Sequence, residues 1–69
     1  MEEKIKVALV IAQEEHRQEC ESIAKLKEQA ANAGAETLID IGRKIERHFE
    51  NVRHLQNRIS MLVCILNRG

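Results

Sequence analysis

Two histidines, a glutamate and a cysteine come closest to forming a chemical site in this sequence: His16, Glu19, Cys20 and His48. His16 and Cys20 are four residues apart, so on a helix both side chains point to one side, as two metal ligands would. Metal sites in helical bundles repeat a ligand motif such as Glu-x-x-His on facing helices, and this chain has no such repeat. We therefore predict that one chain binds no metal and no cofactor; a metal-binding bundle is the alternative.

The same residues have a second interpretation. His16, Glu19 and His48 occupy positions that are otherwise apolar, as described below. A polar residue inside an apolar helix contact fixes the register and the number of chains in coiled coils. We predict that these three residues form a polar core layer.

Catalysis requires a nucleophile beside a base, and a cleft that holds a substrate. Ser22 and Ser60 lie far from any histidine in the helix pairing derived below, and Cys64 lies in an aliphatic run. Two paired helices also offer no cleft. We predict that the chain is not an enzyme.

The helices that carry these residues can be predicted from the spacing of the apolar residues. We call the positions that repeat at this spacing the seam. Steps of four and three residues join the first nine seam positions, which are Ile5, Leu9, Ala12, His16, Glu19, Ile23, Leu26, Ala30 and Ala33. Steps of three and four join the other nine, which are Leu38, Ile41, Ile45, His48, Val52, Leu55, Ile59, Leu62 and Leu66. Such a repeat is typical of helices packed with coiled-coil-like heptads.

The step of five from Ala33 to Leu38 fits neither spacing and indicates a turn. Gly34 suits the left-handed residue that ends many helices, and Thr37 with Asp40 resembles a capping box. We predict one all-α domain over residues 1–69, an antiparallel hairpin with helices at 3–33 and 38–67, each about 30 residues long, and a loop at 34–36. One long helix with the sequence NAGAE as a stutter is the alternative.

The hairpin would place the two chain ends together, and the ends carry apolar residues outside the seam. This set, the open-end patch, comprises Val7, Val10, Ile11, Met61, Cys64 and Ile65. Apolar patches on small chains mark contact surfaces. We predict self-association as a homo-oligomer, most simply a dimer that forms a four-helix bundle, and hence an interaction or assembly module. The alternative is an adaptor or inhibitor that binds another protein through the patch.

Charge and composition argue against other partners. The 11 basic and 11 acidic residues balance, which does not favour nucleic acid, and no apolar run approaches the ~20 residues of a membrane span. A small RNA-binding bundle remains an alternative, because one helix carries four candidate arginines: Arg43, Arg47, Arg53 and Arg58. Two cysteines and no signal-like segment lead us to expect the cytoplasm.

Overall fold

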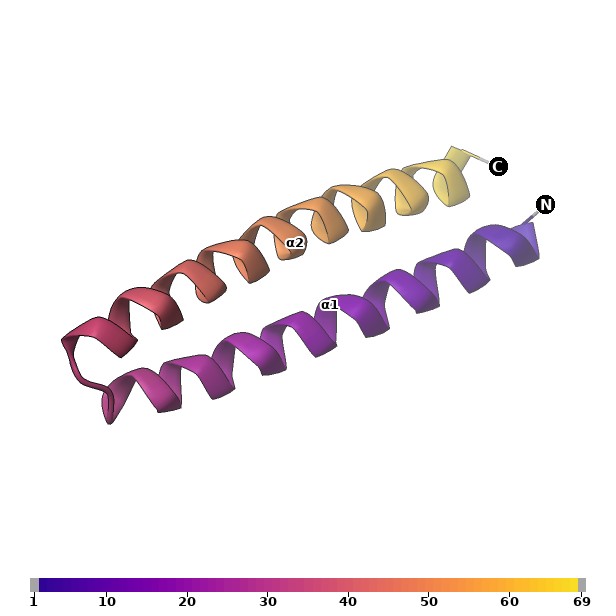
Figure 1. Ribbon diagram of the computed structural model, residues 1–69. Helices are drawn as coiled ribbons and strands as arrows, with labels where there is room; N and C mark the ends of the chain where they lie inside the picture. Colours follow the sequence, from indigo (N-terminus) through magenta and orange to yellow (C-terminus); the bar gives the residue numbers. More distant parts are fainter. Residues whose placement is uncertain (1, 69) are drawn as a thin grey trace.

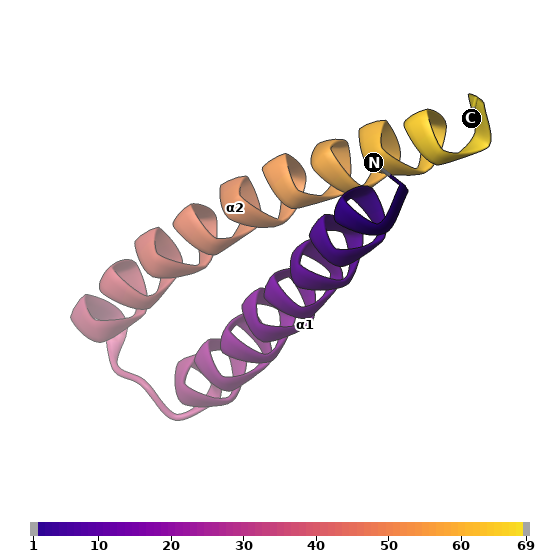
Figure 2. The same ribbon diagram turned by 90° about the vertical axis from the view of Figure 1, so that its right-hand side faces the viewer.

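The computed structural model describes residues 2–68, which form two helices, α1 (Glu2–Ala31) and α2 (Ala35–Arg68). The helices run antiparallel, and the two chain ends lie at the same end of the molecule (Figure 1). Turned by 90°, the helices are inclined to one another (Figure 2). The predicted all-α hairpin is confirmed, and the alternative of one continuous helix is wrong.

The chain reverses over residues 32–34. The amide groups of Asn32 and Ala33 donate to carbonyl oxygens three residues earlier, at 3.2 and 3.3 Å, so α1 closes with a tight 3₁₀-type turn. The amide of Leu38 donates to the carbonyl oxygen of Gly34 at 2.9 Å. This is the first helical hydrogen bond of α2, which makes Gly34 the N-cap residue of that helix.

This turn corrects three sequence predictions. Gly34 does not adopt the left-handed conformation, since no residue among 2–68 has a positive φ. Thr37 and Asp40 do not form a capping box, because α2 begins at Ala35 rather than at residue 38 and Thr37 lies inside its first turn. The loop is accordingly 32–34 rather than 34–36, and α1 ends at residue 31 rather than 33. Glycine is an acceptable N-cap, and Glu36 favours the early start because its charge lies near the positive end of the helix dipole.

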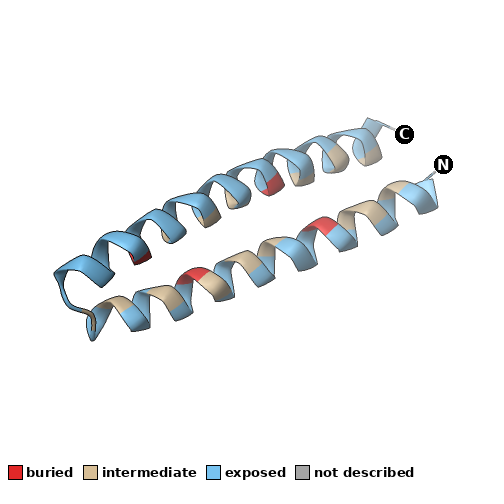
Figure 3. Ribbon diagram, viewed as in Figure 1, coloured by how far each residue is buried: buried red, intermediate tan, exposed pale blue. Residues whose placement is uncertain are grey.

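The seam faces inward on both helices. Its four buried residues within the described chain are Ala12, Ile23, Ile41 and Leu55. Buried and half-buried residues lie on the facing sides of α1 and α2, whereas the outer sides are exposed (Figure 3). Leu38 is the exception, because it is 47% exposed. It lies in the first turn of α2, beside the loop, where α1 has already ended.

The hairpin is elongated, with extents of 52 × 14 × 12 Å. Its radius of gyration is 15.8 Å, compared with about 11 Å for a compact chain of this length. It exposes 5640 Å², whereas a folded monomer of this mass exposes about 4,400 Å². The excess of about 1,200 Å² arises because each helix is covered along one stripe only.

Candidate functional site

Glu19 and His48 form the one side-chain hydrogen bond in the described chain that joins the two helices inside the seam. The Nδ1 atom of His48 donates to the Glu19 carboxylate oxygen Oε2. Their side chains are 24% (Glu19) and 29% (His48) exposed, so the contact is partly shielded from water. A polar pair at this depth is satisfied only when the helices keep this relative position, so it favours one register.

His16 does not join that pair. Its Nδ1 atom lies 3.9 Å from the Sγ atom of Cys20, within α1. Of the sequence-predicted polar layer, the structure therefore brings Glu19 and His48 together and leaves His16 with a neighbour on its own helix. Within residues 2–68, no three His, Cys, Asp or Glu side chains gather where they could hold one metal ion.

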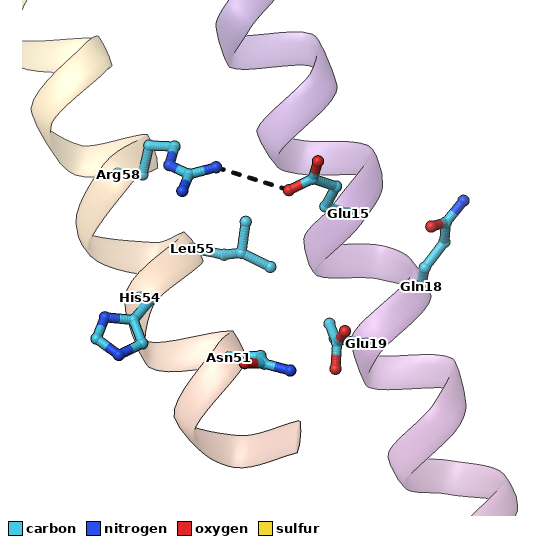
Figure 4. A pocket seen from close by; sticks show the side chains of 7 residues that line it. All are labelled: Glu15, Gln18, Glu19, Asn51, His54, Leu55 and Arg58. Carbon is cyan, nitrogen blue, oxygen red and sulfur yellow. Dashed lines mark ion pairs between the residues drawn. The ribbon is translucent and has the colours of Figure 1, made fainter. Parts of the chain in front are cut away.

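A polar groove of about 380 Å³ runs along one side of the seam (Figure 4). Its lining residues are Glu15, Gln18, Glu19, Asn51, His54, Leu55 and Arg58. Arg58 Nη1 lies 3.7 Å from Glu15 Oε2, and the two side chains reach toward one another across the groove. Both side chains are at least half exposed, so this ion pair contributes only about 0–1 kcal/mol. Sequence reasoning missed this pair; the signal was that both residues directly precede a seam position.

An apolar groove of about 290 Å³ lies on the other side of the seam. Its lining residues are Cys20, Ile23, Ala24, Lys27, Phe49 and Val52. The ammonium of Lys27 lies 5.9 Å from the centre of the Phe49 ring, a cation–π contact, and Phe49 remains 49% exposed. This groove was not predicted from the sequence, in which Phe49 is the single aromatic residue.

All six residues of the open-end patch are exposed. Val10 and Met61 are the most exposed of them, at 63% each. Val63 is a further exposed apolar residue in the same stretch of α2. It was not part of the patch predicted from the sequence.

The four candidate arginines of α2 are all exposed, and three of them, Arg43, Arg47 and Arg58, lie within about 60° of one another around the helix. Arg58 pairs with Glu15. At about 100° per residue, Arg53 and Arg58 point about 140° apart around the helix.

Charge on the outer surface of α1 is paired locally. Arg17 Nη2 and Nη1 lie 2.5 Å from carboxylate oxygens of Glu14 and Glu21, respectively. The hydrogen bond from Arg17 holds the pKa of Glu14 below its ordinary value, and the same bond, with the charges of both carboxylates, raises the pKa of Arg17. Charged residues recur along both helices, and neither helix within residues 2–68 has an uncharged stretch long enough to cross a membrane.

Comparison of the chain with protein-family models, with curated proteins and with solved structures found no match. The surfaces described above are therefore the basis for assigning a function.

Proposed function

We propose that this chain is a non-enzymatic assembly module that associates with itself, most simply as a homodimer of hairpins in a four-helix bundle with coiled-coil-like packing. The observation that carries the proposal is the open-end patch, whose six residues all face solvent in a single chain. Apolar side chains clustered on so small a molecule are stabilised when a partner covers them.

The area of the molecule supports the same proposal. One hairpin exposes about 1,200 Å² more than a compact protein of its mass, and a standard interface buries about 800 Å² on each partner. A second hairpin could remove that excess. Both cysteines are free thiols, which suits a reducing compartment such as the cytoplasm.

The test is the molar mass in solution, measured by sedimentation equilibrium across protein concentration. One chain has a mass of 7.9 kDa. We expect a multiple of this monomer mass at high concentration, falling toward the monomer mass on dilution. Ile11→Lys places a charge in the open-end patch and should shift the equilibrium toward the monomer, because a buried unpaired charge is costly.

Gln18→Lys is the matched control, because it adds the same charge seven residues later on the same face of α1. Both lysines lie within three or four residues of Glu14, so each can form a local ion pair with it on α1. If the molar mass of Ile11→Lys equals that of the parent, the open-end patch is not part of the interface. A chain that keeps the monomer mass at every concentration would refute self-association and leave the patch to a different protein.

A further inference from the structure

The open-end patch is too small to hold two hairpins together by itself. It spans residues 7–11 and 61–65, which is about 7 Å of helix at about 1.5 Å per residue, out of a molecule 52 Å long. Five of its six side chains are 44–63% exposed, so the patch presents several hundred Å² of apolar surface. A standard interface needs about 800 Å² on each side. Any self-association must therefore continue along one flank of the hairpin.

The two flanks differ sharply in chemistry. Residues that directly precede and directly follow the seam positions lie on opposite sides of the seam. Between residues 13 and 58, every residue on the side that carries Glu15 and Arg58 is polar or charged. The other side, the Phe49 flank, carries exposed apolar or small residues (Cys20, Ala24, Ala31, Ile39, Gly42 and Phe49) interspersed with four charged ones (Arg17, Lys27, Glu46 and Arg53).

The Phe49 flank has two further apolar residues at the open end. Val10 and Val63 lie on the same side of the seam and are both exposed, and Gln13 and Arg17 on α1 and Arg53, Gln56 and Ser60 on α2 separate them from the apolar residues at the middle of the flank. The apolar groove lies at the middle of this flank. Arg17 lies on this flank, and its guanidinium is paired with Glu14 and Glu21 of the same helix.

Gly42 is an independent observation on the same flank. It lies inside α2, where glycine is a weak helix former. A Cβ atom built at this position meets nothing within 4 Å, so no contact within the chain requires a glycine there. The absence of a side chain becomes useful when the backbone of a second chain approaches this side of α2.

We propose that a second copy of this chain packs along the Phe49 flank, so that the same flank of each copy is buried against the other. This inference rests on the self-association proposed above and names its surface. A face of 52 by 14 Å spans about 700 Å², close to what each partner contributes to a stable interface. The polar flank, with its Glu15–Arg58 pair, stays in water.

The two native cysteines provide the test, because one lies on each surface. Cys20 lines the groove of the Phe49 flank, Cys64 belongs to the open-end patch, and both are exposed in the single chain. The fully reduced protein is treated with iodoacetamide over a range of protein concentrations. Alkylation of each cysteine is followed by mass spectrometry, and rates in denaturant give the unprotected reference.

We expect the alkylation rate of Cys20 to fall on the order of tenfold at concentrations about 100 times the dissociation constant, where few monomers remain. Protection of Cys64 alone would refute the flank while supporting self-association through the open end. Protection of neither cysteine, together with the monomer mass at every concentration, would refute both proposals.

A pair of variants gives a second readout. Phe49→Glu places a charge in the groove, and Asn51→Glu places the same charge on the polar flank two residues away. Each new glutamate has an arginine four residues away, so each can form a local ion pair on α2. We expect Phe49→Glu to raise the dissociation constant about tenfold or more and Asn51→Glu to leave it nearly unchanged. Equal dissociation constants for the two variants would overturn the flank as the interface. If circular dichroism shows that Phe49→Glu is unfolded, the protection of Cys20 from alkylation in the parent protein decides whether the Phe49 flank is the interface.

Discussion

Replacing Gly34 by serine should stabilise the protein, because Gly34 is the N-cap residue of α2. A serine side chain at an N-cap accepts a hydrogen bond from an amide of the first turn and gains a few tenths of a kcal/mol over glycine. Removing a glycine also restricts the unfolded chain, which contributes about 0.4–1 kcal/mol. The site has room, since a Cβ at Gly34 meets nothing within 4 Å and φ is not positive. The expected gain is about 1 kcal/mol.

The assay is urea unfolding followed by circular dichroism, at one fixed protein concentration because association contributes to stability. In a domain of this size, a gain of about 1 kcal/mol corresponds to a rise of roughly 4–8 °C in the thermal midpoint. Serine is a better probe than asparagine, because asparagine also tolerates the left-handed conformation and would be accepted by either geometry.

The same substitution has the opposite sign if Gly34 ends α1 in a left-handed conformation, because a Cβ is disfavoured there by about 1–2 kcal/mol. Loss of stability in Gly34→Ser would therefore refute the N-cap assignment. Thr37→Ala is the companion variant. Inside the first turn of α2, alanine should be neutral or better by up to about 0.5 kcal/mol, whereas loss of an N-cap threonine would cost about 1 kcal/mol.

Three further outcomes follow from the contacts. Ile23→Ala removes a buried seam side chain and should cost about 2–5 kcal/mol in urea unfolding; a cost below about 0.5 kcal/mol, normal for surface sites, would contradict its burial. Glu19→Leu leaves the His48 imidazole unpaired in the seam and should cost about 1–3 kcal/mol, whereas adding His48→Leu should restore most of that stability; a double variant no more stable than the single one would argue against the pair. The Arg17 hydrogen bond lowers the pKa of Glu14 in the folded protein. The stability that this bond contributes is therefore present above the unfolded-state pKa of 4.5 and is lost as the pH falls through the lower folded-state pKa. The thermal midpoint of the parent should accordingly exceed that of Glu14→Gln at pH about 7 and not at pH about 3. A difference in midpoint that does not change with pH would contradict the lowered pKa of Glu14.

The helices and their inward faces could be predicted from the sequence because burial repeats with the helical period. Ile23 and Leu55 are buried because they continue a spacing that is already visible over many residues. The turn was located, but its details were not. Gly34 satisfies the sequence signals for a helix end and for a helix start equally well, and which one it serves depends on where α2 begins.

The contacts between side chains of different helices were harder to predict from the sequence. Glu19 was assigned to the seam, but its partner His48 depends on how far each helix is rotated and on the reach of both side chains. The Lys27–Phe49 contact and the groove around it depend on the same rotation, which seam spacing leaves undetermined. Leu38 was predicted to be covered because its spacing fits the seam. It is exposed because the facing helix, α1, ends before it.

The elongated shape of the hairpin has a hydrodynamic consequence. A radius of gyration of 15.8 Å equals that of a compact protein of about 180 residues. A single hairpin would therefore diffuse slowly for its mass and leave a gel-filtration column early, at a volume that calibration with globular standards would assign to a dimer or trimer. Two hairpins packed side by side would keep nearly the same length while doubling in mass, so the frictional ratio would fall as the chains associate. Sedimentation velocity separates the two cases, because monomer and dimer differ in frictional ratio even where their elution volumes nearly coincide.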